Sequence, residues 1–125
     1  MKAEDGAKIE PEFNRALAIW HNGDGRAAIP ILEQLLSEYP KAPFILGVLG
    51  AIYYDLEDYE RASDYFQRTL LLNPKSELAS RGLFFSLHDV GKHGEAISEV
   101  ERYLSIAQSK EYDLLIQETL EALDE

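Results

Sequence analysis

The 125-residue sequence predicts an all-α fold built from helical hairpins, and three observations support this. The segment 42–54, APFILGVLGAIYY, carries no charge, although 28% of the chain is Asp, Glu, Lys or Arg. A helix that is apolar on all sides has to be covered by neighbours. Apolar residues then recur at intervals of three and four from Tyr59 to Leu72, before Pro74 stops the pattern. Finally, steps of 34 residues from this hairpin largely keep the size class of the side chains, which indicates a helical repeat.

The central hairpin has a distinctive order of residues. Along the chain it reads Leu46, Leu49, Gly50, Tyr53, Ala62, Phe66 and Pro74. Gly50 and Ala62 allow two helices to approach closely, and Tyr53 and Phe66 fill the space beside them. This is the L-x2-L-G-x2-Y, A-x3-F, P order of the tetratricopeptide repeat, and this part of the chain resembles that family. The resemblance implies a right-handed α-α superhelix, or solenoid, of about three helical hairpins with a C-terminal capping helix.

The resemblance also implies a division of the chain. We expect an N-terminal tail at 1–8 and a repeat domain at 9–125, with repeats at about 9–42, 43–76 and 77–110 and a capping helix at about 111–123. Pro11 suits the first turn of a helix that runs to about Trp20, and Asp24 is a candidate cap for the next helix. Pro30 falls inside that second helix, where it predicts a kink or a late helix start.

The third repeat and the C-terminal segment depart from the pattern. Phe84 replaces the small residue that allows close approach, so either Gly82 relieves the crowding or the hairpin is splayed. The final segment alternates between two kinds of side chain, as a polar-backed capping helix would. Its apolar residues are Leu114, Leu115, Leu120 and Leu123, and its acidic ones are Glu118, Glu121 and Asp124. This cap favours a true C-terminal end, and the weaker first repeat favours a true beginning less strongly.

Composition excludes several classes of partner. The chain has 23 acidic and 12 basic residues, a net charge of −11, and no run of Lys or Arg, so we expect no nucleic-acid partner. The acid excess is explained by a solvated helical surface, or by steering of a basic partner.

No apolar run reaches the roughly 20 residues of a membrane span, and the N-terminus lacks the apolar core of a signal peptide. We expect a cytoplasmic protein, or a periplasmic or other location if a signal segment was removed.

Signals for catalysis or metal binding are weak. The chain has no cysteine, and His21, His88 and His93 contain no H-x3-H pair. Ser86, His88 and Asp89 point in different directions on one helix, so a triad among them is not expected. We therefore expect no enzymatic activity, no metal and no cofactor.

The candidate binding residues come from stacking the first helix of each repeat at the 34-residue period. In the tetratricopeptide family these rows line the concave face, where partner peptides or helices lie. The candidate contacts are Phe13, Leu17, Trp20, Phe44, Gly47, Ala51, Tyr54, Arg81, Phe85 and His88, beside Glu10 and Leu78. By resemblance the wall would be largely apolar, with a notch at Gly47 and Ala51. Trp20, Tyr54 and His88 each combine an aromatic body with a polar tip, which suits half-exposed recognition surfaces.

These residues support more than one function. The leading hypothesis is a protein-interaction scaffold that binds an apolar or amphipathic peptide or helix in its concave groove. The alternative is a structural protein that covers the same wall with a second copy of itself. Some members of the family instead clamp a C-terminal carboxylate, but Phe13, Leu17, Val48, Leu78 and Gly82 stand at those places here and none can hold one. As a further alternative, Phe44 and Leu78 pack neighbouring first helices together, and the capping helix covers Phe85.

Overall fold

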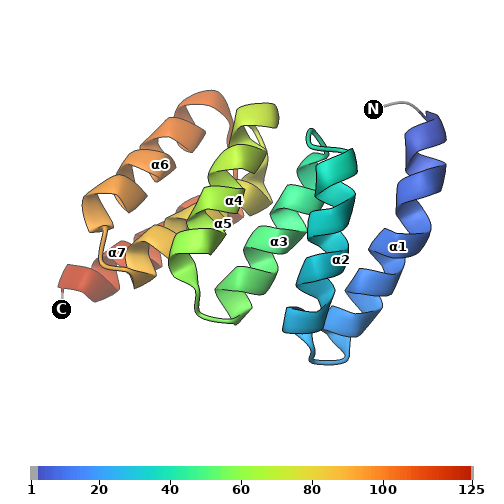
Figure 1. Ribbon diagram of the computed structural model, residues 1–125. Coiled ribbons are helices and arrows are strands. Elements are labelled where there is room, and N and C mark those ends of the chain that lie inside the picture. The colour runs from blue at the N-terminus through green and yellow to red at the C-terminus, as the bar shows by residue number, and fades with distance from the viewer. Residues whose placement is uncertain (1–2, 125) are drawn as a thin grey trace.

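The computed structural model describes residues 3–124, which form seven helices and no strand (Figure 1). The chain runs back and forth through three helical hairpins, and a last helix follows. The helices are α1 (Ala3–His21), α2 (Gly25–Glu38), α3 (Pro43–Asp55), α4 (Tyr59–Leu72), α5 (Glu77–Asp89), α6 (His93–Ile106) and α7 (Lys110–Asp124). The C-terminal ends of α1, α3 and α5 therefore lie on one edge of the molecule (Figure 1).

Local signals fix where most of these helices begin. The Asp24 carboxylate accepts a hydrogen bond of 3.1 Å from the Ala27 backbone N–H, so the cap expected for α2 is confirmed. Asp58 caps α4 in the same way, and the Ser76 hydroxyl caps α5. Each side chain satisfies a backbone donor that has no partner within the helix. Pro43 begins α3, where its missing N–H costs nothing.

The N-terminal expectation does not hold for the part that the structure describes. Residues 3–8 were expected as a tail, but α1 already begins at Ala3, and only Met1 and Lys2 of that tail lie outside the described residues. Pro11 consequently lies inside the helix and not in its first turn. Ile9 explains the extension, because its side chain is almost fully buried in the core formed by α1, α2 and α3. This burial offsets the helical hydrogen bond that Pro11 cannot make.

Pro30 likewise lies within α2, which begins at Gly25. The late helix start that the sequence allowed is therefore wrong. Leu32, Leu35 and Leu36 on the following turns are buried, and this packing holds the helix together across the proline.

The core is divided between the two ends of the solenoid. One cluster of buried residues joins α1, α2 and α3, and the other joins α4, α5, α6 and α7. Tyr53 of α3 packs against both clusters. Its ring stacks on that of Tyr65 with centroids 5.6 Å apart, and the Tyr53 hydroxyl donates to Glu33 Oε1 at 3.2 Å. The two halves are thus joined through the central hairpin.

Gly82 allows a close approach between α4 of the second repeat and α5 of the third. The Phe66 ring of α4 lies between two glycines, so that a Cβ added at Gly82 would lie 2.4 Å from Phe66 Cζ. A Cβ at Gly50 would lie 2.8 Å from Cε1 of the same ring. Phe84, which breaks the repeat pattern, is almost fully buried in the core. Gly82 therefore accommodates a ring of the second repeat, and its contact lies between α4 and α5 and not inside the third hairpin.

The capping helix α7 is attached through a different face from the one expected. Tyr112 and Ile116 are buried, whereas Leu114 is 60% exposed and Leu115 half-buried. The side chains of Leu120 and Leu123 lie outside the described part of the structure. The error arose because the leucines were counted as the apolar face, although a tyrosine can be buried when its hydroxyl finds a partner.

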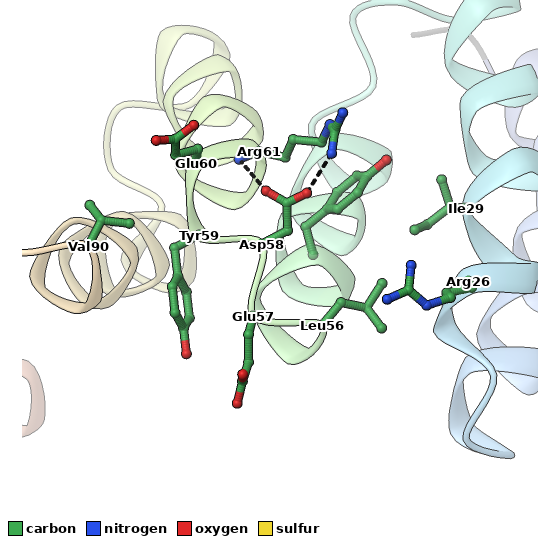
Figure 2. A pocket seen from close by; sticks show the side chains of 10 residues that line it. Arg26, Ile29, Leu56, Glu57, Asp58, Tyr59, Glu60, Arg61 and Val90 are labelled. Atoms are coloured by element: carbon green, nitrogen blue, oxygen red, sulfur yellow. Dashed lines mark hydrogen bonds and ion pairs between the residues drawn. The ribbon is translucent and has the colours of Figure 1, made fainter.

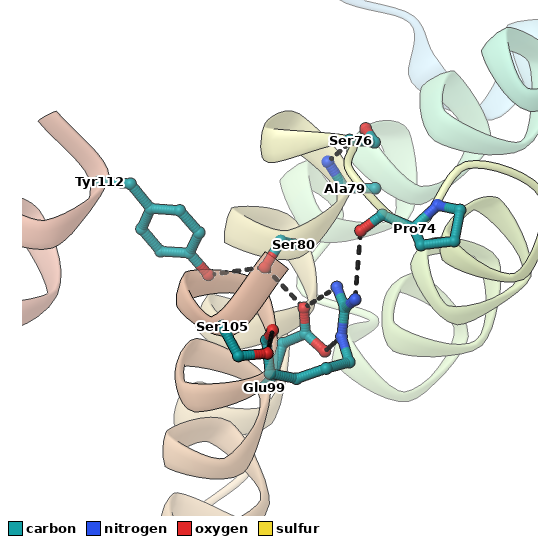
Figure 3. A network of polar contacts seen from close by, with 8 residues as sticks. Pro74, Ser76, Ala79, Ser80, Glu99, Ser105 and Tyr112 are labelled. Carbon is teal, nitrogen blue, oxygen red and sulfur yellow. Dashed lines mark hydrogen bonds and ion pairs between the residues drawn. The ribbon is translucent and has the colours of Figure 1, made fainter. Parts of the chain in front are cut away.

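Tyr112 finds that partner in a buried polar network (Figure 3). Its hydroxyl lies 2.8 Å from Ser80 Oγ, and Ser80 Oγ donates to Glu99 Oε2 at 2.6 Å. Arg102 donates to both oxygens of Glu99 at 2.7 Å and also to the Pro74 carbonyl oxygen at 3.1 Å. Glu99 is only 7% exposed, so the bidentate arginine is needed to compensate its buried charge. The network joins α7 to α5 and α6.

Candidate binding surface on the first helices

A half-exposed apolar wall runs across α1, α3 and α5. Phe13 of α1 meets Phe44 of α3 edge to face, with ring centroids 5.1 Å apart, and Phe44 remains 36% exposed. A Cβ added at Gly47, one turn further along α3, would meet no atom within 4 Å. The notch expected at Gly47 is therefore open space on this face. Leu17 of α1 and Ala51 of α3 are half-buried.

Two hydrogen bonds connect the first helices of successive repeats. The indole Nε1 of Trp20 donates to Asp55 Oδ2 at 3.1 Å, which joins α1 to α3. The hydroxyl of Tyr54 donates to Asp89 Oδ2 at 2.7 Å, which joins α3 to α5. The polar tips that the sequence suggested for a partner are thus already bonded within the chain. The apolar parts of Trp20 and Tyr54 stay half-buried on the wall.

His88 is the member of this series on α5. Its Nδ1 lies 3.1 Å from Asp89 Oδ1 on the same helix, and its ring meets that of His93 at a centroid distance of 5.0 Å. Asp89 therefore contacts Tyr54 through one oxygen and His88 through the other.

The remaining predicted residues lie on α5. Phe85 is half-buried and meets Phe84 edge to face at 5.1 Å. Arg81 Nη1 is 4.0 Å from Glu77 Oε2, and its buried Nε has no hydrogen-bond partner among the described residues. Leu78 is 77% exposed, so it does not serve to pack neighbouring first helices. At the α5 end of the wall, the Arg81 guanidinium therefore has only the distant carboxylate of Glu77 as an ionic partner, and the Leu78 side chain is exposed.

Carboxylates near the C-terminal ends of α3 and α5 raise the pKa values of two neighbouring tyrosines. Burial, together with the hydrogen bond to Asp89 and its negative charge, raises the pKa of the Tyr54 phenol well above its usual value. Desolvation, followed by the charges of Glu57 and Asp89, also raises the pKa of Tyr59. The negative charge of Asp89 therefore contributes to the raised pKa of both Tyr54 and Tyr59.

Hollows of the surface lie elsewhere. One of about 720 Å³ lies at the edge where α3 turns into α4 (Figure 2). It is lined by Arg26, Ile29, Tyr53, Leu56, Glu57, Asp58, Tyr59, Glu60, Arg61 and Val90. Its charged groups serve the fold, since Asp58 caps α4 and accepts from Arg61 Nη1 at 2.6 Å. None of the ten predicted contacts lines this hollow.

A second groove lies between the outer helices α4 and α6. Two adjoining hollows, of about 720 and 540 Å³, share Gln67, Leu83, Glu99 and Arg102. Leu71, which is 83% exposed, stands on one wall. One repeat earlier, the stacked rings of Tyr53 and Tyr65 fill the equivalent place. In the third repeat Leu87 corresponds to Tyr53 and Glu99 to Tyr65, so no ring pair fills the groove. Sequence reasoning did not identify this groove, although the 34-residue comparison shows the exchange.

Other chemical functions find little support in the geometry. Ser86 is buried and its Oγ donates to the Gly82 carbonyl oxygen at 2.7 Å, so it does not face His88 as a nucleophile would. Within residues that the structure describes, no group of three or more His, Asp or Glu side chains is placed to hold a metal ion. No helix of the described part is long and apolar enough to cross a membrane.

Comparison with known proteins identifies the class of fold and then the family. The helical hairpins stacked in one direction are those of an α-solenoid. The chain belongs to the tetratricopeptide repeat family, whose model matches residues 20–83, a little over half of the sequence.

Curated relatives are much longer than this chain. It is 36% identical over 76 residues to the TPR repeat-containing protein MJ1428 of Methanocaldococcus jannaschii, covering 61% of this chain and 13% of that protein. It is 28% identical over 107 residues to the Vi polysaccharide export protein VexE of Salmonella typhi, covering 86% of this chain and 16% of that protein. The chain thus spans a small part of either relative.

Solved structures show the same fold. The first TPR domain of Spaghetti (RPAP3), bound to the HSP90 peptide SRMEEVD, superposes with a TM-score of 0.81 at 17% identity, covering 96% of this chain and 98% of that one. The CopN–Scc3 complex gives 0.81 at 20% identity, covering 98% and 71%. MamA gives 0.74 at 18% identity, covering 78% and 53%. At identities this low, the structural likeness establishes the fold alone. The superpositions confirm the predicted all-α solenoid.

Proposed function

We propose that this chain is a protein-interaction module whose inner wall, on α1, α3 and α5, takes an apolar or amphipathic segment of another protein. The observation that carries the proposal is the combination of a half-exposed Phe44 with open space at Gly47. An amphipathic helix binds in such a groove by placing a few apolar anchors against it. Gly47 presents no side chain, and the open space around it leaves room for an apolar anchor of the partner.

The wall does not suit the kind of contact that acidic C-terminal tails need. The RPAP3 domain is bound to a peptide, SRMEEVD, that carries three acidic residues. Here Phe13, Leu17, Val48, Leu78 and Gly82 replace the clamp residues of the tail-binding members, and Asp55 and Asp89 lie on the same face. A different class of peptide is therefore proposed, and the net charge of −11 argues against nucleic acid.

Binding of a fluorescent peptide, measured by anisotropy, tests the proposal. The probe is an 18-residue peptide of Leu, Gln and Lys, with leucines at helical spacing on one face. Gly47→Leu adds a side chain at a position where a Cβ meets no atom within 4 Å, and it is expected to weaken binding about tenfold or more, as loss of a central anchor does. Phe85→Glu places a charge on the wall and should act in the same direction.

Leu71→Glu provides the matched control on the outer face. Leu71 is 83% exposed on α4, so this variant should bind the peptide as the wild type does. Unchanged binding by Gly47→Leu and Phe85→Glu, with weakened binding by Leu71→Glu, would move the site to the outer groove and contradict the proposal.

Self-association is the second candidate function, and the exposed apolar residues favour it. Leu78 and Leu114 are largely exposed, and large apolar patches are uncommon on soluble monomers. Light scattering across a broad concentration range separates the two candidates. A constant monomer mass supports capture of a foreign segment, whereas a dimer that Phe85→Glu dissociates supports self-assembly through the wall.

A further inference from the structure

Two carboxylates at one edge of the inner wall lack a strong cationic partner. Asp55 is the last residue of α3 and Asp89 the last residue of α5, and both are exposed. Each accepts one hydrogen bond from an aromatic side chain of the preceding repeat. Among the described residues no Lys or Arg lies within 4.0 Å of either carboxylate, and Asp89 has only the imidazole of His88. The aromatic donors therefore fix the position of these charges without neutralising them.

The helix ends add to the negative potential at this edge. The C-terminal end of a helix carries a partial negative charge, so an aspartate there is unfavourable and a cation favourable. The ends of α3 and α5 lie at the same edge of the molecule (Figure 1). Glu57 is the second residue after the end of α3 and is exposed. A cation brought to this edge would be attracted by both aspartates and by both helix ends.

Among the predicted wall residues, Arg81 carries a positive charge and lies away from this edge, whereas Arg26 of α2 lines the hollow next to it together with Glu57. Arg81 precedes Asp89 by eight residues on α5, which at 1.5 Å per residue places them about 12 Å apart along the helix. Its charge is partly offset by Glu77, 4.0 Å away. The surface is therefore asymmetric, with apolar side chains over most of its length and acidic charge at the edge where the first helices end.

We infer that the segment received by this wall is amphipathic and basic along one edge, with Lys or Arg side chains that face Asp55 and Asp89. The inference rests on the proposed function and adds the chemistry of the partner. Neighbouring helix axes lie about 8–10 Å apart. Basic residues would therefore recur about two to three apart in an extended segment, or about five to seven apart in a helical one. The net charge of −11 adds long-range attraction that raises the association rate.

Three model peptides test this inference against the intact chain. Each has 18 residues with the same leucine face, and two edge positions seven apart carry Lys in the first peptide, Gln in the second and Glu in the third. The Lys peptide is expected to bind most tightly and the Glu peptide least. Raising the salt concentration from 50 to 500 mM should reduce this difference.

A pair of charge-neutral variants locates the effect. Asp55→Asn with Asp89→Asn keeps an oxygen acceptor for Trp20 and Tyr54 but removes both charges. This variant should bind the Lys peptide about fivefold more weakly, as the loss of two exposed ion pairs implies, and the Gln peptide as the wild type does. Asp64→Asn with Asp113→Asn, on exposed positions of α4 and α7, changes the net charge equally and should leave the binding of all three peptides unchanged.

The outcomes separate this inference from the proposed function. Equal binding of all three peptides would overturn the basic edge while leaving the wall as the site. Equal weakening by the two double variants would show an effect of net charge alone and would also overturn it. Failure of all three peptides to bind would overturn the proposed function, and the inference with it. Discrimination lost only in the Asp55 and Asp89 variant would support the inference.

Discussion

Replacement of Gly82 by alanine should destabilise the fold through the Phe66 ring. The added Cβ would lie 2.4 Å from Cζ and 2.6 Å from Cε1 and Cε2 of that ring. The buried ring cannot simply move toward α3, because it already lies close to the Cα of Gly50, where an added Cβ would be 2.8 Å away. Ring and backbone must therefore shift together.

The magnitude is the difference between two opposing terms. Overpacking in a core costs about 1–3 kcal/mol, and the higher helix propensity of alanine returns about 0.5–1 kcal/mol. The net loss should be about 1–2 kcal/mol of unfolding free energy. Gly47→Ala is the matched control, because its Cβ meets open space and the propensity term acts alone. It should stabilise the protein by about 0.5–1 kcal/mol.

Urea denaturation followed by far-ultraviolet circular dichroism measures both variants. A second substitution, Phe66→Leu, provides space for the new methyl group, so the cost of Gly82→Ala should shrink in that background. If Gly82→Ala stabilised the protein as much as Gly47→Ala does, the ring would not be held between the two glycines and the reasoning would be refuted.

Three further predictions concern the buried network around Glu99. Tyr112→Phe removes one hydroxyl while Ser80 keeps its bond to Glu99, so a loss of about 0.5–1.5 kcal/mol is expected in urea denaturation, and no loss would show that the hydroxyl does not anchor α7. Arg102→Ala leaves the Glu99 carboxylate buried without its cation and should cost about 2–3 kcal/mol by the same measurement, less than for a fully buried pair because Arg102 is partly exposed. Burial raises the pKa of Tyr112 to about 12, above its unfolded value near 10. Its contribution to stability is therefore complete below pH 10 and lost between about pH 10 and 12, and the melting temperature should fall more over this window in wild type than in Tyr112→Phe.

The helical hairpins could be predicted from the sequence because their signals are local. The apolar run from 42 to 54, the spacing from Tyr59 to Leu72, and the cap at Asp24 each depend on neighbours within a few residues. The start of α1 was missed because Ile9 is held by contacts with other helices, which outweigh the effect of Pro11.

Contacts between repeats were harder to predict. Phe84 breaks the pattern, but nothing local to it reveals that Gly82 accommodates a ring from α4. Tyr112 is buried because its hydroxyl donates a hydrogen bond to Ser80 Oγ, 32 residues earlier, whose own proton goes to Glu99. The 34-residue repeat does not predict this pair, because Ser80 and Tyr112 are not at equivalent positions of two repeats.

The candidate binding surface was predicted in part. Of the residues in these rows, Phe13 of α1 and Phe44 of α3 meet edge to face. The aspartates that follow the aromatic row were overlooked, although Asp55 and Asp89 are themselves 34 residues apart. Nothing local to Asp55 or Asp89 reveals that Trp20 and Tyr54 of the preceding repeats donate hydrogen bonds to them.

Trp20 offers the most direct test of the inner wall, since it is the only tryptophan of the chain and lies half-buried beside Asp55. Its emission spectrum would be recorded while the tryptophan-free Lys peptide is titrated, with anisotropy of the labelled peptide followed in parallel. Binding on the wall predicts a saturable shift of the Trp20 emission to shorter wavelength, with the same midpoint as the anisotropy. An anisotropy curve that saturates while the Trp20 spectrum stays unchanged would place the peptide elsewhere and contradict the account.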